Sequence, residues 1–160
     1  MTTEEDWLQY REVIRAHIEK HGRSIQQVGD SEGDDQQEPP FMYTVGNHAA
    51  GMPELLIVGT NKSGFATVLN RLSDIQKERG RALEHEELVG VGGKFPLRVV
   101  DAGDLGRHYA AFARIYYATE TLEVRQVLLP DPQGRWPDTP GCAAPYREQP
   151  ILSAAAKTPN

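Results

Sequence analysis

At 160 residues and 17.8 kDa, the chain has the length of one domain and can bury an ordinary hydrophobic core. Its 23 acidic and 17 basic residues give a net charge of -6, and without a run of lysines and arginines this argues against nucleic-acid binding. No apolar stretch reaches the roughly 18 residues of a membrane span. Residues 1–6 are acidic, unlike a signal peptide, and Cys142 has no second cysteine for a disulfide, so we expect a soluble, cytoplasmic protein in a reducing compartment.

The first half of the chain alternates between helical and strand patterns. Residues 29–38 interrupt it with five acids and no base, which predicts a mobile, solvated loop. The run 55–59 is apolar throughout, which indicates an inner strand covered on both faces. In chain order, we expect a helix over about residues 4–20, strands over 25–28, 41–46 and 55–59, and a helix over 62–79 that covers the inner strand.

The second half predicts two strands, 88–91 and 95–101, joined by a tight turn at Gly92-Gly93. A third helix from Leu105 to Tyr116 and a last strand over 122–129 follow. Six prolines lie between 130 and 150, so this stretch either wraps the domain as ordered turns or hangs loose, and 151–160 is expected to be a flexible tail. The predicted fold is a single α+β domain over residues 1–150, with a mixed or mainly antiparallel sheet packed against about three helices.

The segment between the strands 41–46 and 55–59 is the first candidate for a functional site. It carries His48 and Glu54, a histidine and a carboxylate close enough across a tight loop to form a general acid/base pair. The alternative is that His48 bonds a backbone group while Glu54 caps or edges a strand. Tyr43 could donate a proton at the same place, or it could pack in the core with its hydroxyl bonded.

The stretch Asp131 to Trp136 is the second candidate. Its prolines favour a fixed shape, and Trp136 offers a flat surface either to a ligand or to the body of the domain. We predict one pocket between the 43–54 rim and the 131–136 loop. The candidate catalytic residues are His48, Glu54 and Asp131, and the candidate ligand-binding residues are Tyr43, Thr44, Asn47, Gln126 and Trp136.

Other motifs are incomplete. His17 and His21 are spaced as a helical pair, but His21 beside Gly22 more simply complements the helix dipole, and no metal site is predicted. The glycines before Lys94 lie between two strands rather than before a helix, so a hairpin turn is favoured over a phosphate loop. Cys142 is a lone cysteine in a proline-rich segment, which is typical of an inert thiol. No motif identifies a cofactor.

Several of these motifs together resemble the domain of unknown function family 4262, a bacterial family common in actinobacteria. The resemblance covers most of the chain and is carried by His21-Gly22, the run 39–46, Pro53-Glu54-Leu55, Leu69-Asn70, Gln126, Pro130-Asp131, Gly134-Arg135 and Pro140-Gly141-Cys142. Met52 stands where the family pattern commonly has a histidine, which weakens a mechanism that needs two loop histidines. The resemblance implies a compact bacterial α+β domain and brings no activity, ligand or catalytic residue.

Three functional classes therefore compete. The leading hypothesis is a binding or accessory domain that holds a small molecule or peptide between the two loops. The second is a small acid/base or hydrolytic enzyme that uses His48 with Glu54 or Asp131. The third is an interaction or immunity-like protein whose acidic residues, 30–38, contact a basic partner. The sequence leaves the oligomeric state open.

Overall fold

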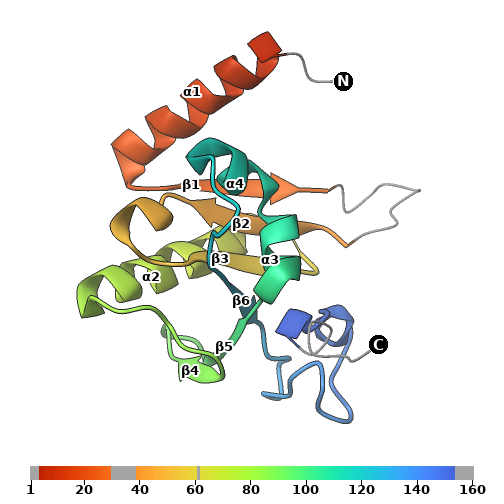
Figure 1. Ribbon diagram of the computed structural model, residues 1–160. Helices are drawn as coiled ribbons and strands as arrows, with labels where there is room; N and C mark the ends of the chain where they lie inside the picture. The colour runs from red at the N-terminus through yellow and green to blue at the C-terminus, as the bar shows by residue number, and fades with distance from the viewer. Residues whose placement is uncertain (1–3, 30–38, 61, 154–160) are drawn as a thin grey trace.

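The computed structural model describes residues 4–29, 39–60 and 62–153, and these form one mixed, six-stranded sheet with helices on both faces (Figure 1). The strands lie in the order β1-β2-β3-β6-β5-β4, and only β3 and β6 are parallel neighbours. The elements are α1 (Glu4–His21), β1 (Ser24–Val28), β2 (Phe41–Val45), η1 (His48–Ala50), β3 (Glu54–Val58), α2 (Gly64–Arg79), β4 (Glu87–Val89), β5 (Leu97–Asp101), α3 (Gly103–Tyr109), α4 (Ala111–Tyr117), β6 (Val124–Leu128) and η2 (Tyr146–Glu148).

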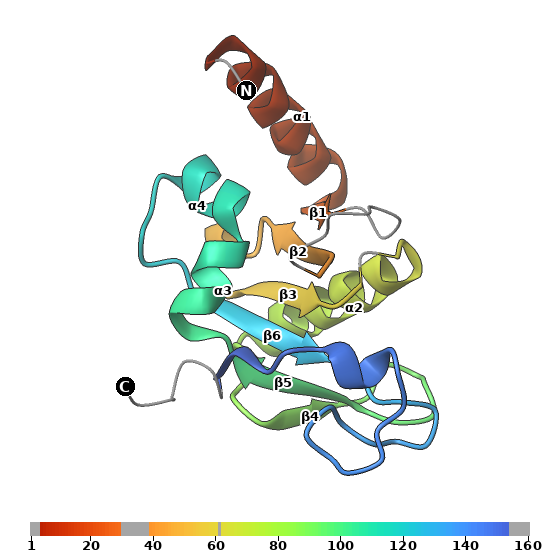
Figure 2. The ribbon, with the colours of Figure 1, turned by 90° about the vertical axis from the view of Figure 1, so that its right-hand side faces the viewer.

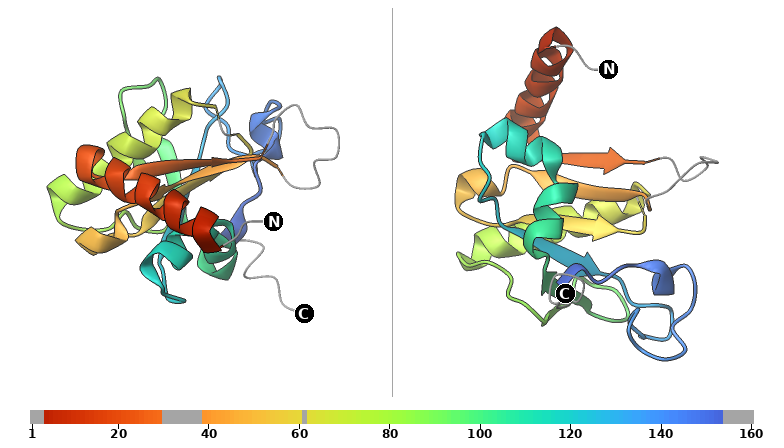
Figure 3. Two further views of the ribbon diagram at one scale, coloured as in Figure 1. Left: turned by 90° about the horizontal axis from the view of Figure 1, so that it is seen from above. Right: turned by 45° about the vertical axis from the view of Figure 1, so that its right-hand side comes forward.

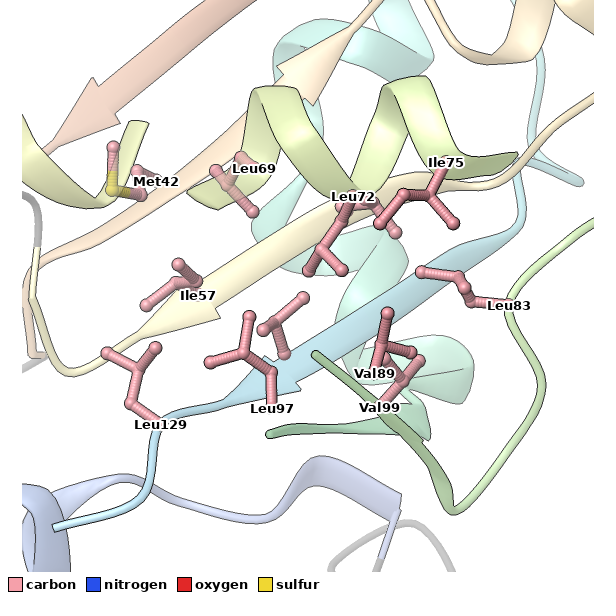
Figure 4. Packing of buried hydrophobic residues seen from close by; sticks show 12 residues of the cluster. Met42, Ile57, Leu69, Leu72, Ile75, Leu83, Val89, Leu97, Val99 and Leu129 are labelled. Atoms are coloured by element: carbon pink, nitrogen blue, oxygen red, sulfur yellow. The ribbon is translucent and has the colours of Figure 1, made fainter. Parts of the chain in front are cut away.

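Strand β3 is buried along its whole length, as its apolar sequence predicts. Because side chains alternate across a strand, Leu55 and Ile57 face a core that includes Leu69 and Leu72 of α2 (Figure 4). Leu56 and Val58 belong to a second core on the opposite face of the sheet, which α3 and α4 cover (Figure 3). The two cores explain why β3 carries no exposed polar position.

Helix α1 extends past β1, away from the body of the domain (Figures 1 and 2). Ile14 is its buried residue, and the ring of Trp7 stacks on Phe112 of α4 with the ring centroids 5.9 Å apart. Leu8 and Val13 of this helix are more than half exposed. Tyr10 also donates a hydrogen bond to Gln26 of β1, and His17 Nδ1 lies 3.3 Å from Ser24 Oγ, so the helix is attached by a few apolar and polar contacts. No helix within the described residues is both long and apolar enough to cross a membrane.

The predicted α+β single-domain fold is confirmed, but two local predictions are wrong. The expected third helix is divided into α3 and α4 at Ala110, whose φ of -85° and ψ of 46° leave the helical region. The strands β4 and β5 do pair, but residues 90–96 connect them instead of a tight Gly92-Gly93 turn. Pro96 has no N–H to extend the ladder beyond the Val89–Leu97 pair, so the connection opens there.

The proline-rich segment is ordered over the described part of the chain and lies along the end of β6 (Figure 2). Leu152 is buried in the second core, so the expected flexible tail does not begin at residue 151. The predicted mobile acidic loop lies, apart from Gly29, outside the described residues. The same is true of the tail from residue 154 onward.

Candidate functional site

The loop between β2 and β3 is organised by the buried carboxylate of Glu54. Its Oε1 accepts hydrogen bonds from the Thr44 hydroxyl at 2.6 Å and from the Asn47 N–H at 3.1 Å. Its Oε2 accepts bonds from the N–H groups of Gly46 at 3.1 Å and His48 at 2.9 Å. Burial raises the pKa of Glu54, whereas these four hydrogen bonds act to lower it. One carboxylate thus fixes the chain from residue 44 to residue 48.

Two of the predicted ligand-binding residues, Thr44 and Asn47, belong to the same buried network. The Thr44 hydroxyl accepts the Leu55 N–H at 2.9 Å while it donates to Glu54. The Asn47 side-chain amide donates to Ser73 Oγ at 2.9 Å and to the Pro53 carbonyl at 3.2 Å, which ties the loop to α2. Their polar groups are occupied inside the protein, so we assign Thr44 and Asn47 to loop support.

His48 meets Glu54 through its main chain, because it is the His48 N–H that donates to the carboxylate. Its imidazole packs against the ring of Tyr117, with the centroids 4.7 Å apart and the planes inclined by 56°. A catalytic pair requires the carboxylate to orient the imidazole. The geometry instead matches the structural alternative for both residues, in which His48 bonds with its backbone and Glu54 holds the start of a strand.

Tyr43 lies in the core and not on a rim. It is fully buried, and its hydroxyl accepts the N–H of Phe112 at 3.0 Å. Burial raises the pKa of this phenol far above its ordinary value. Since the first N–H groups of a helix lack intrahelical partners, Tyr43 supplies one at the start of α4. A buried, bonded phenol is a poor proton donor to a ligand at the surface.

Gln126 and Gln149 attach the C-terminal segment to the sheet, each through hydrogen bonds between its side-chain amide and backbone groups. The buried Gln126 amide donates to the Pro150 carbonyl at 2.6 Å and accepts the Leu152 N–H at 2.9 Å. The Gln149 amide donates to the carbonyl of Leu129 and accepts its N–H, both at 2.8 Å. Each side chain thus replaces a strand partner. Gln126, predicted to bind a ligand, has its amide occupied by the chain itself.

Asp131 has a corresponding role in the loop 131–136. Its side chain is fully buried and accepts the N–H groups of Gln133 at 2.9 Å, Arg135 at 2.8 Å and Ala143 at 2.9 Å, while Arg135 Nε lies 3.1 Å from Oδ2. Trp136 is half-buried, and a local turn bonds its carbonyl to the Thr139 N–H at 2.8 Å. The loop is rigid because its carboxylate is saturated by its own backbone.

The pKa of Asp131 gives a test of this arrangement. Burial acts to raise it, but the hydrogen bonds from the backbone of Arg135, Ala143 and Gln133 and from the Arg135 guanidinium outweigh burial and lower the pKa to about 2. Because the folded-state pKa lies below the unfolded value of about 3.9, the ionised group stabilises the fold fully above that value. This stabilisation is lost as the pH falls through about 2.

Asp131→Asn should therefore be most destabilising near neutral pH. The difference in the free energy of unfolding between the variant and the wild type should shrink by about half or more as the pH falls toward 2. Urea unfolding at several pH values measures this difference. The matched control is Asp104→Asn, because the Asp104 side chain is 94% exposed. A difference that stays constant from neutral to acidic pH would contradict the role of the charge.

The predicted pocket between the 43–54 rim and the 131–136 loop is wrong. Glu54 pairs with Val124 in the parallel β3–β6 ladder, so the rim lies at the amino-terminal end of both strands. Asp131 follows the carboxyl-terminal end of β6, roughly 20 Å further along at the spacing of extended chain. Figure 1 shows the η1 loop on the left and the C-terminal segment on the lower right. His48 therefore cannot act with Asp131.

The surface is hollowed at the carboxyl-terminal ends of β3 and β6. Two adjoining hollows, of about 270 and 410 Å³, share a wall made by Phe65 of α2, Leu129 after β6 and Tyr146 of η2. We call them together the Phe65–Tyr146 groove. Its first hollow is closed by Pro40, Gly59, Thr60, Lys62, Pro145 and Gln149, and its second by Val68, Val91, Gly93, Lys94, Phe95, Leu97, Pro130, Asp131 and Pro132.

Sequence reasoning missed this groove, although Asp131 and Pro132 of the predicted 131–136 loop line its second hollow. Its three wall residues come from segments far apart along the chain. Taken one at a time, each has the sequence pattern of a core residue or of a connecting segment. The available signal was the parallel pair itself: crevices at the carboxyl ends of parallel strands are frequent ligand sites in open sheets. That signal requires the β3–β6 pairing, which local patterns do not encode.

Metal ligands and thiols do not assemble elsewhere in the described part of the chain. No group of three or more His, Cys, Asp or Glu residues is placed there to hold a metal ion, and the rings of His17 and His21 lie 6.5 Å apart. Cys142 is buried, which raises the pKa of its thiol, and its Sγ lies 3.5 Å from the Arg135 carbonyl oxygen. Such a thiol is weakly nucleophilic at neutral pH.

The fold and the groove define a compact α+β domain with an apolar crevice at the end of its parallel strands. Comparison with known families assigns it further, because residues 17–143 match the model of the domain of unknown function DUF4262. The chain belongs to this family. No curated protein and no solved structure matches it.

Proposed function

We propose that the protein is a small-molecule-binding domain whose ligand occupies the Phe65–Tyr146 groove. The observation that carries this proposal is the shared apolar wall of Phe65, Leu129 and Tyr146 between two adjoining hollows of about 270 and 410 Å³. Together they fall in the size range of small-molecule sites, which are mostly apolar and carry few polar groups. The proposal keeps the binding class expected from sequence and moves its site to the other end of β3.

The walls of the groove are supported from behind. Leu129 is buried and belongs to the core between the sheet and α2, and Phe65 and Tyr146 pack against the same core. The Gln149 side chain bonds both the main chain of Leu129 and the Tyr146 carbonyl, and so it holds η2 beside Leu129. We call this set of hydrogen bonds the Gln149 clamp. A groove whose walls are already in place loses little conformational entropy when a ligand enters, which favours binding.

The test uses phenylnaphthylamine, a neutral aromatic probe whose fluorescence rises in apolar surroundings. Phe65→Ala should weaken its binding by about fivefold or more, because the variant removes a shared wall of both hollows. The matched control is Ile115→Ala, since Ile115 is an exposed apolar residue of α4 outside the groove. Thermal unfolding of both variants checks that they fold.

Amide shift mapping by NMR should place the probe beside residues 59–60, 62–65, 129–132 and 145–149. Absence of probe binding, or binding that Phe65→Ala leaves unchanged while Ile115→Ala weakens it, would overturn the proposal.

A further inference from the structure

The charged side chains that line the Phe65–Tyr146 groove include more bases than acids, the reverse of the chain as a whole. They are Lys62 in the first hollow and Lys94 and Asp131 in the second. The negative charge of Asp131 is already compensated, because Arg135 and three backbone N–H groups surround its carboxylate. The two lysines are thus the charges that a ligand would meet, in a chain whose acids outnumber its bases by 23 to 17.

Both lysines are placed beside apolar surface. The ammonium of Lys94 lies 5.3 Å from the centroid of the Phe95 ring, and Phe95 lines the same hollow. Lys62 lies two residues before α2 begins at Gly64, and the first turn of this helix carries no acid. The positive end of the helix dipole therefore adds to the charge of Lys62. Each hollow combines an aromatic wall with a positive group.

We infer that the ligand joins an apolar or aromatic body to an anionic group, as an aryl or alkyl carboxylate, sulfonate or phosphate does. This inference rests on the proposed function, since it names the class of ligand for the same groove. The apolar body would contact Phe65, Leu129 and Tyr146, and the anionic group would pair with Lys62 or Lys94. A cationic ligand would have no free carboxylate among the described lining residues.

Two probes that differ by one charge test the inference. Anilinonaphthalene sulfonate has the ring system of phenylnaphthylamine with an added sulfonate. The protein should bind the sulfonate about five- to tenfold more tightly, because partly exposed ion pairs contribute modestly. High salt should reduce this preference, since salt screens exposed charges. Lys62→Gln/Lys94→Gln should abolish the preference, so that the affinity for the sulfonate falls to that for the neutral probe. The control Lys77→Gln, at the far end of α2, should leave the preference as in the wild type.

The outcomes separate this inference from the proposed function. Equal affinity for the two probes, with Phe65→Ala weakening both, would overturn the anionic ligand and keep the groove. A sulfonate preference that survives in the double variant would also overturn it, because the preference would then arise elsewhere. Binding of neither probe would overturn the proposed function itself. The single variants locate the anionic group, since the one that abolishes the preference identifies its lysine.

Discussion

Replacing Glu54 by glutamine should lower the free energy of unfolding by about 3 kcal/mol. Each carboxylate oxygen accepts two hydrogen bonds, so an amide nitrogen at either place would face donors. Turning the amide over does not help, because backbone N–H groups contact both oxygens. Buried donors without an acceptor are costly, and a chain of this length should lose about 6–12 °C in its unfolding midpoint.

Urea and thermal unfolding measure this loss. The control is Glu123→Gln, just before β6, whose side chain is 67% exposed and should tolerate the change. If Glu54→Gln unfolded at the wild-type midpoint, the carboxylate would not be what fixes the β2–β3 loop, and the case for a structural rather than a catalytic Glu54 would fail.

The roles of Glu54 and His48 show where sequence reasoning stops. The order of elements could be predicted because each depends on local patterns: the apolar run of β3 and the periodic face of α2 are readable from neighbouring residues. The partners of Glu54 depend on how β2 pairs with β3, which brings the Thr44 hydroxyl to the Leu55 N–H and to the carboxylate. In the sequence, a histidine and a glutamate six positions apart give the same pattern whether the imidazole or the backbone N–H of the histidine contacts the carboxylate.

The break at Ala110 and the position of the groove have the same origin. Leu105, Tyr109 and Tyr116 fit one helical period, and this pattern does not show that the hydroxyl of Tyr43, on β2, accepts the Phe112 N–H at the start of α4. The groove likewise needs the parallel β3–β6 pair to set its floor. Long-range pairing, rather than local propensity, decided both of these features, whereas the open β4–β5 connection has a local cause in Pro96.

Gln149→Leu should have the second large effect, a loss of about 2–4 kcal/mol in the free energy of unfolding together with weaker probe binding. The leucine fills the same space but leaves the N–H and the carbonyl of Leu129 without their side-chain partner. The Tyr146 carbonyl loses the side-chain amide and keeps the backbone N–H of residue 149, at 3.3 Å. The end of β6 and η2 then separate, which removes the Tyr146 wall of the groove.

Hydrogen exchange distinguishes this local effect from general destabilisation. The Leu129 amide should lose protection more than the amides of β3, which bond within the sheet. Gln133→Leu, an exposed position in the same segment, is the matched control and should leave both the protection and the binding unchanged. Full protection of the Leu129 amide in Gln149→Leu would show that the clamp does not hold the segment. Because Gln149 also lines the groove, the stability of the protein and its affinity for the probe should fall together in this variant.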